Sequence, residues 1–191
     1  MAAATIREDE TVLDVEQFLK LPEVKPALEY IGGRVIQKMS PRYRHSSIQT
    51  ELLAALNAYA KPRRLGVARP ELRLTFGGAS VVPDISYIAR ERLPRDADGK
   101  VSEEFRVAPD LAVEIRSTGQ TIRELSTRLS HCLRHGGRMG WLVDPKSKRV
   151  HVFESGRSAR ILDEASTLEG GELLPGFALP VRNIFAWADE I

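Results

Sequence analysis

Two carboxylates in apolar segments, Asp84 and Glu114, are the residues best placed to do chemistry. Asp84 follows a proline in VVPDISYI (81–88), and Glu114 lies in APDLAVEIRS (108–117). Both segments are rich in Val and Ile and are therefore expected to be strands. If the strands meet, the two carboxylates could share a hard divalent cation, Mg²⁺ or Mn²⁺, which proteins bind through one or two carboxylates plus waters and phosphates.

The second strand carries further charges on the same face as Glu114. Side chains alternate along a strand, so Asp110, Glu114 and Arg116 point one way and the intervening apolar residues point the other. Charged groups on an apolar strand are costly unless they have partners or a ligand. Asp110 is therefore a weaker third candidate for the metal, and Arg116 a candidate cation. The alternative is that the carboxylates cap strand ends or pair with arginines, with Arg116 bridging to Glu114 or Asp110.

An ordered set of blocks resembles a known group of proteins. The blocks are LEYIGGRVIQKMSP (28–41), His45 at the start of a helix, VVPDISYI, APDLAVEIRS, and GWLVDPKSKRVHVF (140–153). Together they resemble the PD-(D/E)XK nuclease superfamily and, within it, the bacterial Uma-type restriction endonuclease family. The three-residue core motif has low specificity, whereas the ordered set of blocks is much more specific.

The resemblance implies a fold and an activity. The fold is α/β (mixed α+β), with a restriction-endonuclease-like core: a mixed, curved β-sheet flanked by helices, plus an N-terminal helix and hairpin. The activity is Mg²⁺- or Mn²⁺-dependent cleavage of DNA, with Asp84 and Glu114 as metal ligands. His45 would lie near the mouth of the site, although a structural histidine fits that position as well. By analogy, a homodimer is expected because cutting two strands needs two sites.

One departure from the family pattern concerns the expected lysine. The resembling superfamily places it two residues after the glutamate or on the following helix, positions that fall here on Arg116 and, counting back from Trp141, on Arg128. Arginine is always protonated and cannot act as a general base, although its planar fork binds phosphate well. The alternative function is therefore a degenerate nuclease fold that binds nucleic acid or a protein without cleavage. Arg128 could also be a surface residue.

Hydrophobic periodicity predicts the elements that position these residues. Helices are expected at 11–21 with Asp14 or Thr11 as cap, at 45–59 with Ser46 or Ser47 as cap, and from Thr121 to His135. Hairpins are expected at 28–39 and at 139–155. Strands 66–76 and 81–88 are expected to pair across Gly77-Gly78, and 90–106 is expected to be a long loop. Further strands are expected near 158–162 and 171–174, before a short C-terminal helical turn.

Composition supports a single globular domain over 1–191, with 1–10 frayed. The chain has 191 residues, 42% of them hydrophobic and 28% charged. Its net charge of +2 says little about nucleic acid, so candidate phosphate contacts are local: Arg42, Arg44 and Arg73, each of which could equally be solvated surface. A lone cysteine, Cys132, rules out an intrachain disulfide, and the absence of a long apolar run predicts no membrane span. We therefore expect a cytoplasmic protein.

Overall fold

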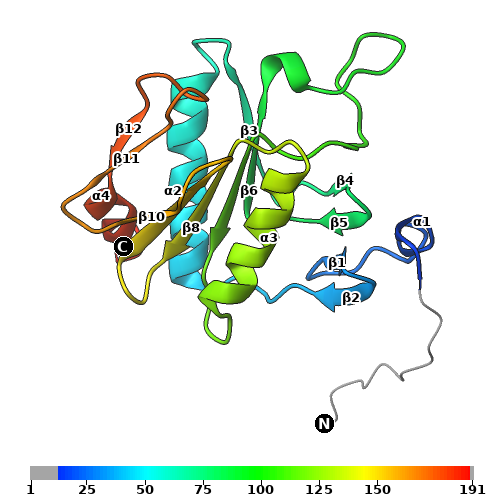
Figure 1. Cartoon of the computed structure of the whole chain (residues 1–191), viewed down its shortest axis with the longest axis horizontal. Coiled ribbons are helices and arrows are strands. Elements are labelled where there is room, and N and C mark those ends of the chain that lie inside the picture. The colour runs from blue at the N-terminus through cyan, green and yellow to red at the C-terminus, as the bar shows by residue number, and fades with distance from the viewer. Residues whose placement is uncertain (1–12, 190–191) are drawn as a thin grey trace.

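The computed structural model describes residues 13–189, which form a large mixed sheet and a smaller sheet with helices packed around them (Figure 1). The α/β class predicted from the sequence is confirmed. The segment 1–10, predicted to be frayed, lies outside the described residues. Across residues 13–189, none of the helices combines the length and the apolar character needed to cross a membrane.

The large sheet has six strands in the order β10-β9-β8-β7-β6-β3. β7 and β8 are parallel, and every other neighbouring pair is antiparallel. A parallel pair needs a crossover connection, and α3 supplies it between β7 and β8. The strands are β3 Gly66–Pro70, β6 Ile85–Ala89, β7 Leu111–Ile115, β8 Met139–Asp144, β9 Arg149–Glu154 and β10 Arg160–Leu162.

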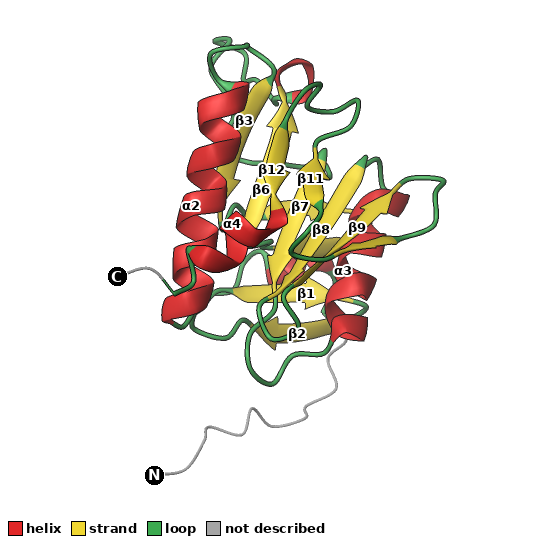
Figure 2. Ribbon diagram, turned by 90° about the vertical axis from the view of Figure 1, so that its left-hand side faces the viewer, coloured by secondary structure: helices red, strands yellow, loops and turns green. Residues whose placement is uncertain are grey.

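Two long helices, α2 (Tyr43–Ala60) and α3 (Ile122–Arg134), cover opposite faces of this sheet (Figure 2). Alternation along β7 accounts for the two layers, because Val113 packs in the core under α2 while Ala112 packs in the core under α3. The core under α2 also contains residues of three C-terminal elements, β11 Thr167–Glu169, β12 Ala178–Pro180 and α4 Val181–Ala186.

The smaller sheet has four strands in the order β2-β1-β5-β4 and shares a core with α3. Its first two strands form the predicted hairpin, turning at Gly32 and Gly33 with φ of 60° and 79°, values that glycine adopts without strain. The N-terminal helix α1 (Val15–Phe18) packs beside it, with Phe18 stacked on Tyr30. The strands are β1 Leu28–Ile31, β2 Arg34–Gln37, β4 Leu74–Phe76 and β5 Ala79–Val81.

The predicted antiparallel pairing of 66–76 with 81–88 across Gly77-Gly78 is confirmed, but neither segment is one continuous strand. Each segment breaks in the middle: β3 pairs with β6 in the large sheet, and β4 pairs with β5 in the small sheet. Glu71 has a φ of 45°, and Pro83 has no N–H to donate, so neither fits a regular strand. The breaks lie side by side, since Glu71 N donates to the Asp84 carbonyl at 3.2 Å. Asp84 therefore lies where the two sheets part.

The helix boundaries differ modestly from the predicted ones. α1 begins after Asp14, whose side chain caps it as expected, and ends well before the predicted position. α2 begins at Tyr43, before the predicted caps Ser46 and Ser47, and Arg42 at its N-cap makes no side-chain cap. Thr121 caps α3 as predicted. The predicted loop at 90–106 contains the short 3₁₀ helix η1 (Arg90–Arg92).

Candidate functional site

Asp84 and Glu114 lie opposite each other on neighbouring strands. β6 and β7 are antiparallel with Ile85 facing Val113, so continuing this register by one residue sets Asp84 opposite Glu114. Opposed residues of an antiparallel pair share a face, with Cβ atoms about 4.5–5.5 Å apart. The Asp84 side chain also reaches the partner strand, where its Oδ2 accepts a hydrogen bond from Ile115 N at 2.7 Å. The structure thus brings the two predicted carboxylates together.

Asp84 is held by side chains from the segment after β2 and from α2. Lys38 Nζ lies 2.8 Å from Oδ1, and His45 Nε2 lies 3.0 Å from Oδ2. Gln49, one turn after His45 on α2, donates to the Asp84 carbonyl at 2.7 Å. Burial alone would raise the pKa of the Asp84 carboxyl, but the hydrogen bond from His45 and the charge of Lys38 outweigh it and lower the pKa below its usual range. Asp84 is therefore held ionised.

Lys38 is a member of the site that the sequence analysis did not assign. It follows β2 directly, and its Nζ donates to the Val82 carbonyl at 2.8 Å as well as to Asp84. Its side chain is 10% exposed, yet burial does not depress its pKa, because Asp84 and Glu114 raise it. The pairing of Tyr30 in β1 with Ser80 in β5 brings the hairpin to this place. Nothing in the spacing of the sequence signals that pairing.

Glu29 and Arg128 complete the charged groups. Glu29 in β1 accepts a hydrogen bond from Val82 N at 2.7 Å, and its second oxygen accepts one from Arg128. Arg128 projects from α3, and its Nε lies 3.3 Å from Glu114 Oε1. Although burial would lower the pKa of the Arg128 guanidinium, Glu114 and Glu29 raise it. The alternative that Arg128 is a surface residue is wrong, because its side chain is only 15% exposed and forms ion pairs with both Glu29 and Glu114.

Glu114 is the least satisfied of the three carboxylates. It is buried, and among residues 13–189 no donor makes a hydrogen bond to its carboxylate oxygens; its close partner is the Arg128 ion pair. Burial raises the pKa of Glu114 to about 8, with Arg128 offsetting part of the effect. We refer to Glu29, Lys38, His45, Asp84, Glu114 and Arg128 as the charged cluster.

Asp110 is not part of this cluster. It directly precedes β7 and lies four positions before Glu114, a span of about 13 Å in an extended chain. Its oxygens accept hydrogen bonds from Arg92 and from Ala89 N, each at 2.8 Å. Within the described part of the chain, no group of three or more His, Cys, Asp or Glu side chains could hold a metal ion. The expectation that Asp110 joins Asp84 and Glu114 as a third ligand therefore has no support in the geometry.

Arg116 pairs with neither Glu114 nor Asp110, contrary to the bridging alternative. Its guanidinium lies 3.1 Å from Asp144 and donates to the Gln120 carbonyl at 2.9 Å. It lines a depression of about 610 Å³ that also contacts His45. We call this the arginine-lined depression, after its basic members Arg42, Arg44, Arg116 and Lys146.

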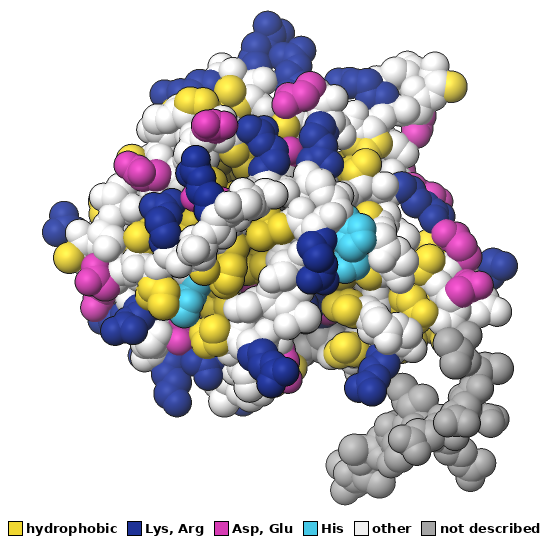
Figure 3. All heavy atoms as spheres, viewed as in Figure 1, with side chains coloured by type: hydrophobic (Ala, Val, Ile, Leu, Met, Phe, Trp, Pro, Cys, Tyr) yellow, Lys and Arg dark blue, Asp and Glu magenta, His cyan; other side chains and the backbone are white. Residues whose placement is uncertain are grey.

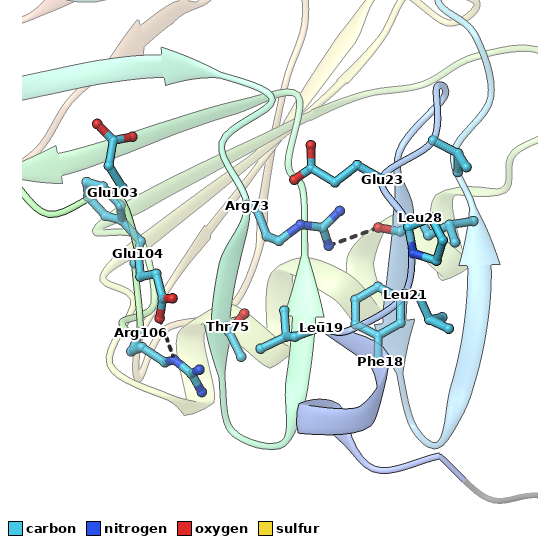
Figure 4. Close-up of a pocket in the computed structure, with 13 residues that line it drawn as sticks. Phe18, Leu19, Leu21, Glu23, Leu28, Arg73, Thr75, Glu103, Glu104 and Arg106 are labelled. Carbon is cyan, nitrogen blue, oxygen red and sulfur yellow. Dashed lines mark hydrogen bonds and ion pairs between the residues drawn. The ribbon is translucent and has the colours of Figure 1, made fainter.

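Arg73, the third predicted phosphate contact, is not among the residues that line the arginine-lined depression. It points into a separate cavity of about 310 Å³ between α1, β1 and the 103–106 segment (Figure 4). There it donates to the Leu28 carbonyl and to Ser80, and its guanidinium lies 5.4 Å from the centre of the Phe18 ring. Basic side chains on the face that carries α3 are interspersed with acidic ones rather than gathered in one patch (Figure 3).

Comparison with known proteins identifies the family. The model of the Uma2 family, described as "Putative restriction endonuclease", matches residues 15–182, a span that contains the whole charged cluster. The chain belongs to the Uma2 family. The resemblance inferred from the ordered blocks is thereby confirmed.

A solved structure supports the same relationship for this Uma2 chain. The crystal structure of a putative nuclease of family DUF820 from Anabaena variabilis is 38% identical, with a TM-score of 0.89 over 92% of this chain and 99% of that one. A search of curated proteins gave no match. The Uma2 chain is therefore similar to a protein described as a putative nuclease over 92% of its length.

Two carboxylates of this Uma2 chain have the chemistry to hold a divalent cation. No donor among the described residues makes a hydrogen bond to the Glu114 carboxylate. Asp84 Oδ1 accepts a hydrogen bond from the ammonium group of Lys38. Glu29 is committed to Val82 N and Arg128. One or two carboxylates suffice for Mg²⁺ or Mn²⁺, whose other ligands are waters and substrate oxygens. The residues present fit such an ion.

Proposed function

We propose that this Uma2 protein is a Mg²⁺- or Mn²⁺-dependent endonuclease that hydrolyses phosphodiester bonds in DNA. The observation that carries the proposal is the cross-strand pair of Asp84 and Glu114, two buried carboxylates in unlike environments. Asp84 is held ionised by donors, whereas Glu114 lacks them. A buried carboxylate without a hydrogen-bond partner is costly, and a bound cation would remove that cost.

The charges of the cluster support the proposal. With Glu114 protonated, as its raised pKa implies near pH 7, Glu29 and Asp84 balance the cations Lys38 and Arg128. A divalent cation would displace the Glu114 proton and leave the cluster with a single positive charge, which one phosphodiester group would cancel. Metal and substrate together would thus keep the buried cluster neutral.

The residues of the chain would then have separate roles. When bound, the divalent ion would polarise the phosphate and lower the pKa of a water molecule. Asp84 and Glu114 would hold the ion, with His45 and Gln49 fixing the orientation of Asp84 and Arg128 fixing that of Glu114. In the hydrolysis, the water oxygen bonds to phosphorus while the bond from phosphorus to the leaving sugar oxygen breaks. The water loses one proton, and the leaving oxygen gains one.

DNA would bind across the arginine-lined depression, which contacts His45 and so adjoins the charged cluster. Arg42, Arg44 and Lys146 could neutralise successive phosphates there. Arg73 remains a weaker candidate because its guanidinium is bonded to Leu28 and Ser80. A cytoplasmic location and a homodimer, which would supply one site for each DNA strand, belong to the same proposal.

A second candidate function is nucleic-acid or protein binding without cleavage. The observations that favour it are the burial of Asp84 and Glu114, each 3% exposed, and the engagement of both arginines that replace the expected lysine. Such a protein would bind DNA with a strong salt dependence but would not cut it.

Calorimetric titration with Mn²⁺ and Mg²⁺, followed by cleavage of supercoiled plasmid, tests the proposal. Wild-type protein should bind the ion and cut the plasmid, while Asp84→Asn should lose both. Asp98→Asn, which alters an exposed carboxylate outside the cluster, is the matched control and should behave as wild type. Metal binding that survives in Asp84→Asn would rule out the proposed site. DNA binding without metal binding or cleavage would support the second candidate.

A further inference from the structure

Lys38 enters the charged cluster from the residue that directly follows the exposed strand β2. The four residues of β2 before it are all exposed, but its own side chain turns inward and is 10% exposed. Its Nζ lies 2.8 Å from a carboxylate oxygen of Asp84 and 2.8 Å from the carbonyl oxygen of Val82. A carboxylate and a carbonyl are oxygen donors of the kind that bind cations, so the ammonium occupies a cation position.

The two arginines at the expected lysine positions are committed elsewhere. Arg116 bonds to Asp144 and to the Gln120 carbonyl and makes no recorded contact with Asp84 or Glu114. Arg128 contacts the cluster but is bonded to Glu29 through its terminal nitrogen and paired with Glu114 through Nε. Moving Arg128 to a substrate would leave the buried Glu29 carboxylate without its cation, which is costly.

Lys38 is paired with one carboxylate, whereas Arg128 is paired with two. Lys38 also lines a depression of about 700 Å³ beside the hairpin, formed in addition by Lys25, Pro26, Met39, Glu71 and Val82. Its side chain therefore lies between the Asp84 carboxylate and this depression. A lysine carries its charge on a flexible four-carbon stem and can exchange one oxygen partner for another without moving the backbone.

We propose that Lys38 is the catalytic cation of this site, which leaves Asp84 when that carboxylate holds a divalent ion and then contacts the substrate phosphate. The inference rests on the proposed nuclease function and adds to it the residue that replaces the missing lysine. In the absence of metal, Lys38 neutralises Asp84. With metal and DNA present, it stabilises the charge that develops on the phosphate.

Three variants test this assignment. Lys38→Met keeps the length of the stem and removes the charge, Lys38→Arg keeps the charge, and Lys61→Met is the matched control. Lys61 is exposed at the C-terminal end of α2, about 24 Å along the helix from His45. Two readouts are needed: Mn²⁺ affinity by calorimetry without DNA, and the single-turnover rate of plasmid cleavage.

Lys38→Met should bind Mn²⁺ roughly tenfold more tightly than wild type, because an ammonium no longer competes for Asp84 and like charges no longer repel. The same variant should cut DNA about 100-fold more slowly, the loss typical of removing one charge-stabilising donor. Lys38→Arg should retain cleavage within about tenfold of wild type. Lys61→Met should match wild type in both measurements.

Cleavage by Lys38→Met at the wild-type rate would overturn the assignment of Lys38 and leave the nuclease function intact. Weaker Mn²⁺ binding in that variant would also overturn it, since Lys38 would then be a structural support of Asp84. If methionine prevents folding, Lys38→Gln, which keeps a donor for the Val82 carbonyl, is judged by the same two outcomes. Wild-type protein that neither binds Mn²⁺ nor cuts DNA would overturn both proposals.

Discussion

The two ends of β7 carry acidic residues in contrasting states. Asp110 and Glu114 share a face of the strand, and both are buried. Asp110 accepts hydrogen bonds from Arg92 and from Ala89 N, so the cost of its burial is offset locally. The carboxylate of Glu114 forms an ion pair with Arg128 but accepts no hydrogen bond among residues 13–189. The hydrogen bonds of Asp110 support the fold. The carboxylate of Glu114 is the one that the proposed function assigns to a metal ion.

The surroundings of each end explain the difference. At the Asp110 end, η1 follows β6 directly and delivers Arg92 to the carboxylate, while the backbone of Asp110 bonds to Tyr87, Arg138 and Met139. At the Glu114 end, the partner strand β6 begins only after Pro83 and Asp84, where the two sheets part. Backbone and arginine contacts therefore enclose Asp110, whereas Glu114 pairs with Leu142 of β8 on one side and has left the β6 strand pairing on the other.

The largest expected effect concerns cleavage. Glu114→Gln should lower the rate of plasmid cleavage by at least about 10³-fold, because a metal ion supplies several kcal/mol of transition-state stabilisation and this variant removes one of its ligands. Asp110→Asn, at the other end of the strand, should cut at a rate close to wild type when folded. Equal losses in the two variants would remove the functional distinction between the ends.

The next effect concerns stability. Asp110→Ala should lower the free energy of unfolding by about 3 kcal/mol, because the Arg92 guanidinium and the Ala89 N–H lose their acceptor. Urea unfolding monitored by circular dichroism measures the change. Asp98→Ala, at an exposed carboxylate, should leave the unfolding curve where it is. An Asp110→Ala protein as stable as wild type would show that the bonds at this end contribute nothing.

A pH-dependent effect follows from the raised pKa of Glu114, about 8 in the folded protein against an ordinary value of 4.5. Between these values the folded protein binds a proton that the unfolded chain has lost. The stability of the metal-free protein should therefore fall as pH rises through this window, by at most about 1.4 kcal/mol per pH unit. Asp84, whose pKa is lowered, acts in the opposite sense and contributes stability that is lost as pH falls below about 4.

Urea unfolding of metal-free wild type and Glu114→Gln at pH 5, 6.5 and 8 isolates the contribution of Glu114. The glutamine variant should have the flatter profile and should be the more stable of the two at pH 8. Parallel profiles for the two proteins would mean that Glu114 titrates normally.

The smallest effect concerns DNA affinity. Arg42→Ala, in the arginine-lined depression that His45 also lines, should weaken DNA binding several-fold and reduce the slope of log affinity against log salt by about one. Arg138→Ala removes an exposed arginine at the Asp110 end and should change neither. Fluorescence anisotropy at several salt concentrations measures both. A larger loss in Arg138→Ala would place the DNA at the wrong end of the sheet.

Local sequence patterns were enough to place Asp84 and Glu114. Alternation placed Glu114 on one face of its strand, and the apolar segment 81–88 placed Asp84 in a neighbouring strand, although the break at Pro83 was not predicted. The predicted helix from Thr121 to His135 also supplied the crossover that the parallel pair β7 and β8 requires. These features depend on residues close together in the chain.

Features that depend on distant pairing could not be predicted in this way. The break at Glu71 needs a positive φ at a residue other than glycine, which leaves no mark in the composition. Lys38 joins the cluster only because β1 pairs with β5, and Asp110 is satisfied only because Arg92 returns from the segment that follows β6. Each is a tertiary contact between residues whose types alone suggest nothing special.

The parting of the two sheets beside Asp84 has a mechanical consequence. Glu29 and Lys38 belong to the hairpin of the smaller sheet, whereas Glu114 belongs to the larger one. A slight tilt of the smaller sheet against the larger one would move Glu29 and Lys38 together relative to Glu114. The tilt would thereby change the distances within the charged cluster, where the proposed ion would bind. Apolar residues of the core between the layers, such as Phe76 and Leu129, would then influence ion affinity at the proposed site without contacting the ion.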